Sequence, residues 1–316
     1  MKQKLLLTKS RIEEWYREHN GDVYVSVSGK DSTVLLDIVR SLYPEVPAVT
    51  VDTGLEHPEN SRFLKKVNNI IRLKPEMSFK EVISSFGYPV ISKMTARKLY
   101  TLQNPTKNNA LTTNLYQTGM NSKGEYKSGS KLPNKWRYLV DNADNIKFSH
   151  KCCDIMKKHP LMQFERENKL KGYVGTMADE GIERRRSYLI TGCNPYHGKG
   201  YSKPLSFWTN QDILQYIHET GIPISAAYGK VIQNEKGLYE TTGEARTGCM
   251  FCLFGCHLEK EPNRIQRLEQ TYPSLYAYCI RDDEEDRPGP GLGKVMDLIG
   301  VPYTCKEMRR REEGRL

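Results

Sequence analysis

The sequence predicts an α/β fold, and the clearest sign is a strand, a loop and a helix that follow one another within residues 23–39. Four of the five residues 23–27 are β-forming, whereas residues 33–39 are apolar at helical spacing. Residues 26–32 are therefore expected to form the turn between the strand and the helix. A chain of 316 residues can bury one large α/β core together with an appended domain.

The turn at residues 26–32 is predicted to bind an anion. It leads into the N-terminus of a helix, where unpaired backbone N–H groups and the positive end of the helix dipole converge. An ordinary capped turn with a solvated lysine is the alternative, and the loop matches neither Walker A nor G-x-G-x-x-G. The predicted site consists of Ser28, Gly29, Lys30, Asp31 and Ser32.

Residues 27–32, with the sequence Val-Ser-Gly-Lys-Asp-Ser, resemble the SGGKDS signature of the PP-loop superfamily, the N-type ATP pyrophosphatases. The end of the signature is intact, whereas Val27 and Ser28 replace its first serine and first glycine. The resemblance implies that ATP is cleaved between its α and β phosphates, giving an adenylated intermediate and pyrophosphate. It also implies catalytic roles for Lys30 and Asp31, with Mg²⁺ across the phosphates.

A second strand is predicted to begin near residue 49 and to end at Asp52-Thr53-Gly54. In the PP-loop superfamily the corresponding residues lie at the nucleotide, so the resemblance implies that Asp52, Thr53 and Gly54 contribute to nucleotide binding. The alternative is that an aspartate followed by Thr-Gly only caps a helix or forms a turn.

The cysteines form two pairs, an adjacent pair and a later Cys-x-x-Cys, with 95 residues between them. Adjacent cysteines rarely form a structural disulfide with each other, and nothing at the N-terminus suggests secretion. Four thiolates in two pairs are typical of a metal site, for which zinc and iron–sulfur are the candidates. The eight cysteines are Cys152, Cys153, Cys193, Cys249, Cys252, Cys256, Cys279 and Cys305.

Residues 151–161 resemble the CC-x-x-x-K-x-x-P-L stretch of assimilatory sulfonucleotide reductases, the PAPS/APS reductase family, and residues 249–252 resemble its later Cys-x-x-Cys. The resemblance implies a [4Fe–4S] cluster, with Cys256 as an alternative ligand. The implied ligands are Cys152, Cys153, Cys249 and Cys252.

Two further stretches complete the resemblance to this family. Residues 173–186 resemble its GTRxxES…R region, in which Asp179, Glu180 and Glu183 could equally cap a helix. Residues 203–213 resemble its PLxxWTxxDV element, in which Thr209 or Asn210 is predicted to cap an amphipathic helix. The residues implied to bind the nucleotide are Gly175, Thr176, Arg184 and Arg186.

The resemblance implies a doubly wound, mostly parallel sheet of the adenine nucleotide alpha hydrolase type, followed by a C-terminal iron–sulfur and helical region. The expected domains are residues 1–245, which bind the nucleotide, and residues 246–316, which complete the cluster site. Residues 104–134, rich in Asn, Thr, Lys, Gly and Ser, are expected to be a flexible lid or a partner-binding loop, with disorder as the default.

The net charge of +10 fits nucleic-acid binding, a pocket for polyanionic nucleotides, or scattered surface lysines. Basic residues alternate with aromatic ones in residues 107–138, a pattern that can follow a phosphate backbone and stack bases. A hydrophobic content of 38% with no long apolar run predicts a cytoplasmic protein that does not interact with membranes.

Three functions are compatible with these patterns. In the first, the protein adenylates a substrate and transfers sulfur, as in thiolation of tRNA or phosphorothioation of DNA, with a cysteine desulfurase as a partner implied by analogy. The second is a sulfonucleotide reductase that releases sulfite and needs a thiol reductant. The third is a non-enzymatic, cluster-bearing protein that binds nucleic acid.

Two features separate the first two functions. Reductases of this family typically lack the Lys-Asp of the signature, whereas Lys30 and Asp31 are present here, which favours ATP. Reductases carry their nucleophile in a C-terminal ECGLH or ECGIH motif, and the late Cys305 lacks that setting. Cys305 is a candidate nucleophile because neighbouring basic residues would lower its pKa, with a free surface cysteine as the alternative.

Overall fold

The computed structural model describes residues 1–195, 200–283 and 288–304 and divides the chain into two compact units. Unit 1 consists of Met1–Pro75 and Lys157–Gly248, and unit 2 consists of Glu76–Met156 and Cys249–Leu316. The last of the three boundaries along the chain, 248/249, lies three residues after the predicted one at 245/246. Residues 76–156 group with the C-terminal segment, whereas the prediction placed them in the nucleotide-binding domain.

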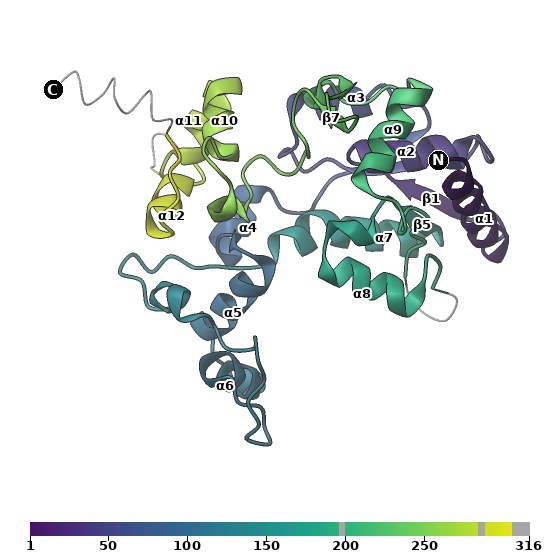
Figure 1. Cartoon of the computed structure of the whole chain (residues 1–316). Coiled ribbons are helices and arrows are strands. Elements are labelled where there is room, and N and C mark those ends of the chain that lie inside the picture. The colour runs from purple at the N-terminus through teal and green to yellow at the C-terminus, as the bar shows by residue number, and fades with distance from the viewer. Residues whose placement is uncertain (196–199, 284–287, 305–316) are drawn as a thin grey trace. The chain divides into compact units, whose positions relative to one another are not determined.

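Unit 1 is built on a four-stranded sheet with the strand order β3-β2-β1-β5. The neighbouring strands β1 and β5 are labelled in Figure 1. All three neighbouring pairs are parallel, with Val25 opposite Ala48 and Tyr173 in the two pairs that involve β1. The predicted mostly parallel α/β sheet is therefore confirmed. The strands are β1 (Val23–Ser26), β2 (Ala48–Val51), β3 (Ile70–Leu73) and β5 (Lys171–Val174).

Helices cover both faces of this sheet, as expected for a doubly wound fold. Val23 and Val25 point to one face, where they join a core formed with α1, α2 and α9. Tyr24, between them, points to the opposite face and packs with Phe164 of α7. This alternation follows from the two-residue period of a strand. The helices are α1 (Lys2–Glu18), α2 (Lys30–Arg40), α7 (His159–Asn168) and α9 (Asn210–Thr220).

The start of α9 confirms the predicted cap. Thr209 Oγ1 accepts a hydrogen bond from the backbone N–H of Asp212, and the Asp212 carboxylate accepts one from the backbone N–H of Thr209. The apolar side of α9 is buried through Ile213, Leu214 and Ile217. Unit 1 also contains α3 (Pro58–Leu64), α8 (Ile182–Thr191) and the antiparallel strands β6 (Val231–Gln233) and β7 (Tyr239–Thr241).

Unit 2 is mainly helical and contains one parallel pair of short strands, β4 (Val90–Ile91) and β8 (Leu253–Phe254). This pair joins the two chain segments from which the unit is formed. The helices are α4 (Phe79–Phe86), α5 (Lys93–Gln103), α6 (Ala110–Thr118), α10 (Arg264–Thr271), α11 (Pro273–Ile280) and α12 (Leu292–Leu298).

The insert at residues 104–134, for which disorder was the default expectation, contains regular structure. Residues Ala110–Thr118 form α6, which ends at Gly119 in the left-handed conformation that favours glycine (φ +88°). The polar composition misled the prediction, because the helix buries Tyr116 alone among its residues. Within the described ranges, no helix is both long enough and apolar enough to cross a membrane.

Candidate functional site

A tight connection between β1 and α2 forms the first wall of the candidate site. The strand ends at Ser26 and the helix begins at Lys30, so the loop is shorter than the predicted residues 26–32. Lys30, Asp31 and Ser32 form the first turn of the helix. The loop is short because Ser32 Oγ accepts hydrogen bonds from the backbone N–H groups of Ser28 (2.9 Å) and Gly29 (3.1 Å).

A cavity of about 340 Å³ opens beside this connection, and all of its lining residues belong to unit 1. One part of the lining is the end of β1 and the start of α2. Another part follows β5, and a third comes from residues 228–247. The lining residues are Ser26, Ser28, Gly29, Lys30, Asp31, Ser32, Val174, Gly175, Thr176, Glu180, Arg184, Tyr228, Arg246 and Thr247.

Two glycines allow these segments to approach one another. A Cβ atom on Gly175 would lie 2.8 Å from Ser32 Cα and 2.9 Å from Ser32 N, so the end of β5 could not lie against the first turn of α2. A Cβ atom on Gly29 would lie 2.7 Å from the hydroxyl of Tyr228. The cavity can therefore have this shape only because neither position carries a side chain.

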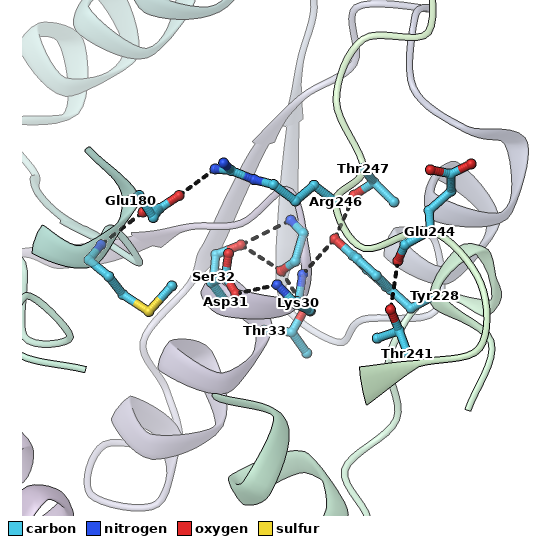
Figure 2. Close-up of polar contacts among 12 residues, drawn as sticks. Lys30, Asp31, Ser32, Thr33, Glu180, Tyr228, Thr241, Glu244, Arg246 and Thr247 are labelled. Atoms are coloured by element: carbon cyan, nitrogen blue, oxygen red, sulfur yellow. Dashed lines mark hydrogen bonds and ion pairs between the residues drawn. The ribbon is translucent and has the colours of Figure 1, made fainter. Parts of the chain in front are cut away.

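Lys30 is a buried cation in the wall of the cavity. It is 3% exposed, and its Nζ lies 2.9 Å from Asp31 Oδ1 (Figure 2). Buried lysines require a partner, since removing an ammonium group from water is costly. Asp31 provides that partner, and its side chain, 22% exposed, remains accessible.

The hydroxyl of Tyr228 is hydrogen-bonded to a backbone N–H group at the start of α2. It accepts a hydrogen bond from the backbone N–H of Lys30 (3.0 Å) and lies 2.6 Å from Thr247 Oγ1 (Figure 2). Burial raises the pKa of Tyr228, so the phenol stays neutral at physiological pH. This contact covers one of the amides that an anion at a helix N-terminus would use.

Glu180 links the two arginines of the cavity. Its carboxylate forms ion pairs with both Arg184 and Arg246 and also accepts a hydrogen bond from the backbone N–H of Met177 (2.9 Å). Burial and the charge of Arg246 lower the pKa of Arg184, whereas the charge of Asp31 raises it. With Lys30 included, the lining carries three positive and two negative side chains, so the cavity is positive overall.

The cavity includes eight of the twelve residues predicted to bind phosphate or nucleotide. Asp52, Thr53, Gly54 and Arg186 are not among its lining residues, and their predicted roles stay predictions. Asp52 instead forms an ion pair with Arg72 (2.6 Å). The eight predicted residues that line the cavity are Ser28, Gly29, Lys30, Asp31, Ser32, Gly175, Thr176 and Arg184.

Sequence reasoning missed Tyr228, Arg246 and Thr247, and it assigned Glu180 only a capping role. Tyr228 and Lys30 are 198 positions apart in the sequence, so no local pattern could have paired them. One signal was present for Arg246 and Thr247, which lie three and two residues before Cys249, the first residue of the Cys-x-x-Cys stretch.

The four predicted cluster ligands, Cys152, Cys153, Cys249 and Cys252, all belong to unit 2. Burial raises the pKa of Cys252 to about 11, and the charges of Cys249 and Cys153 contribute in the same direction. No three His, Cys, Asp or Glu side chains within the described residues are grouped to hold a single metal ion. Cys305, the predicted nucleophile, lies outside the described residues, and its role stays a prediction.

Two kinds of comparison with known proteins gave matches, one to a family model and one to solved structures. The model of the phosphoadenosine phosphosulfate reductase domain family matches residues 22–115 and 98–253. One similar solved structure is the phosphoadenylyl-sulfate (PAPS) reductase from Candida auris in its phosphate complex, with 14% identity and a TM-score of 0.38, covering 69% of this chain and 82% of that one. No curated protein matches the sequence. Because the family model spans most of the chain, the protein belongs to the phosphoadenosine phosphosulfate reductase domain family.

Proposed function

We propose that this protein is an ATP-using enzyme that adenylates a substrate in the course of sulfur transfer. The observation that carries the proposal is the position of Lys30, which is buried in the cavity wall at the N-terminus of α2 and paired with Asp31. Reductases of this family typically lack both residues, whereas an enzyme that releases pyrophosphate needs a cation at the phosphates.

The reaction would proceed by attack of an acceptor oxygen on the α-phosphorus of ATP. The bond between the α-phosphorus and the oxygen that bridges to the β-phosphorus breaks, and pyrophosphate leaves with the electron pair. The N-terminus of α2 and Lys30 would stabilise the charge that develops on the leaving group. Arg184 and Arg246 would neutralise the remaining phosphate oxygens. Asp31, a carboxylate exposed in the cavity, fits the role of an oxygen ligand to Mg²⁺.

The cysteines of unit 2 would hold a [4Fe–4S] cluster, which supplies electron-transfer or sulfur chemistry when bound. The backbone N–H of Cys252 donates to the carbonyl oxygen of Cys249 (3.1 Å), so the two candidate ligands of the Cys-x-x-Cys stretch lie in one turn. The residues that would hold the cluster are Cys152, Cys153, Cys249 and Cys252. The sulfur would come from a cysteine desulfurase.

The cluster is tested by measuring iron, acid-labile sulfide and zinc in protein purified without oxygen. Iron and sulfide in equal amounts support the cluster, and zinc alone contradicts it. Cys252→Ser is expected to remove the iron, whereas Cys193→Ala, which alters a buried cysteine of unit 1, is expected to keep it.

A direct comparison of substrates tests the proposed reaction. The protein is incubated with ATP and Mg²⁺, and separately with adenylyl sulfate or phosphoadenylyl sulfate plus a thiol reductant. Pyrophosphate from ATP without sulfite supports adenylation. Sulfite from a sulfonucleotide without pyrophosphate contradicts it and establishes a reductase.

The reductase is the second candidate because family membership supports it equally well. The paired guanidinium groups of Arg184 and Arg246 would suit a sulfate group as well as a phosphate group, since both are tetrahedral oxyanions. The retained Lys30-Asp31 pair is the feature that this alternative leaves without a role.

A further inference from the structure

Half of the formal net charge of the chain is concentrated in one segment of unit 2, residues 104–139, which we call the basic arm. The basic arm carries six basic residues and one acidic residue, a net charge of +5 out of +10 for the whole chain. Its acidic residue, Glu125, forms an ion pair with Lys127 (2.8 Å). Its exposed basic residues are Lys107, Lys123, Lys127, Lys135 and Arg137.

The basic arm is a formed surface and not a loose polar loop. Lys98 of α5 is 4% exposed and donates hydrogen bonds to the carbonyl oxygens of Gly129 (2.5 Å) and Lys131 (3.0 Å). The backbone N–H of Leu132 donates to the carbonyl of Tyr116 (2.7 Å), and both of these side chains are buried. The loop is thereby fastened to α5 and α6, which lie next to each other in Figure 1.

Two exposed tyrosine rings lie among these charges. Tyr126 is 62% exposed and its ring passes over Gly119, where a Cβ atom would lie 2.5 Å from Tyr126 Cε2. Tyr138 is 51% exposed and its hydroxyl donates to the carbonyl of Leu298 (2.9 Å). Each side chain is therefore held by one contact while more than half of it stays exposed, and so little conformational entropy would be lost on stacking.

We propose that the basic arm binds single-stranded nucleic acid. Exposed lysines and arginines would neutralise phosphates, and the rings of Tyr126 and Tyr138 would stack on bases, which is how proteins hold single strands with little sequence preference. That this strand is the acceptor for sulfur rests on the proposed function. The binding itself does not, because the basic arm contributes nothing to the lining of the cavity.

Fluorescence anisotropy with the full chain tests this proposal, using labelled 20-nucleotide DNA and RNA single strands and the corresponding duplexes at several salt concentrations. Tighter binding to either single strand than to its duplex is expected, and the two single strands distinguish DNA from RNA. Changing Lys107, Lys123 and Lys127 together to Glu should weaken binding at least tenfold. The triple variant should also lower the salt slope by about 2, since each phosphate contact on a single strand contributes about 0.7.

The matched control changes three exposed lysines of unit 1, Lys65, Lys66 and Lys74, to Glu, with the same change in net charge. An equal loss in the control would mean that charge in general, and not the basic arm, attracts the strand, and would overturn the proposal. Tyr126→Ala should weaken binding about fivefold, while Tyr126→Phe, which keeps the ring, should not. Lys30→Ala should leave the binding of single-stranded nucleic acid unchanged. A failure of the proposed ATP reaction can therefore be distinguished from a failure of nucleic-acid binding.

Discussion

Two sides of the cavity, which we call the loop wall and the arginine wall, are lined by different kinds of groups. The loop wall, Ser28–Ser32 with Gly175, is made largely of backbone and short side chains, with the buried Lys30 as its one long side chain, and hydrogen bonds to Ser32 Oγ hold the loop closed. The arginine wall consists of the long side chains of Glu180, Arg184 and Arg246, and the two arginine side chains are 43% and 67% exposed. The first wall is closed by packing, whereas the second is closed by ion pairs in contact with water.

This difference indicates a division of roles. The loop wall is fixed by close contacts, so it decides where an anionic group can lie. The arginine wall has two long, partly exposed side chains, so its shape is less fixed than that of the loop wall. The arginine wall should hence influence which ligand binds, while the loop wall should determine whether any ligand reacts.

The largest effect is expected at Lys30. Lys30→Ala should lower pyrophosphate release from ATP by about 100-fold to 1,000-fold, because a preorganised charge at the leaving group is removed. The iron content should stay unchanged, since the cluster ligands belong to unit 2. Loss of both together would mean that Lys30 is structural. Lys30→Met, which keeps much of the volume and removes the charge, separates lost packing from lost charge.

A smaller effect is expected at Gly175, the other component of the loop wall. A methyl group there would meet the backbone of Ser32, which cannot move aside as a flexible side chain can. Gly175→Ala should lower the free energy of unfolding by about 1–3 kcal/mol, the range for overpacked positions, and weaken nucleotide binding. Urea denaturation and nucleotide titration measure the two effects. Gly248→Ala is the control, because its Cβ atom would meet nothing within 4 Å.

Arg246 tests the opposite wall. Arg246→Ala should weaken ATP binding about tenfold at low salt and less at high salt, because the lost interaction is electrostatic and exposed. The free energy of unfolding should change by less than about 0.5 kcal/mol, as for other surface substitutions. Arg185→Ala removes the same charge from an exposed neighbour that does not line the cavity. An equal loss of ATP affinity in Arg246→Ala and Arg185→Ala would mean that the arginine wall has no specific role in binding ATP.

The contrast between the walls also explains how much of the site the sequence could predict. The loop wall follows from residues near one another in the chain, so the strand, the turn and the helix start could be inferred from residues 23–39. The helix still began earlier than predicted. Ser32, expected within the loop, closes the turn through its hydroxyl, and periodicity in apolar residues cannot detect such a bond.

The arginine wall and Tyr228 depend on the tertiary structure. Arg184 was predicted because three adjacent arginines cannot share one helical face, but Arg246 comes from a segment without apolar periodicity. The grouping of residues 76–156 with the C-terminal segment was equally hidden, because it depends on pairing of β4 with β8, which are 163 positions apart at Val90 and Leu253. Such contacts follow from packing of the whole chain, not from local patterns.

The smallest effect is expected at Tyr228, whose hydroxyl contacts both the start of α2 and Thr247. Tyr228→Phe keeps the ring and removes the hydroxyl that accepts the backbone N–H of Lys30. That buried N–H loses its partner in the free protein, at a cost of about 1 kcal/mol, and a bound phosphate oxygen can replace the partner. Unfolding should therefore become easier while ATP binds up to about fivefold more tightly, as measured by calorimetry. Because burial raises the pKa of Tyr228, the difference should stay constant from pH 7 to 9. Weaker binding by the variant would mean instead that the hydroxyl donates to the ligand and belongs to the part of the site that selects it.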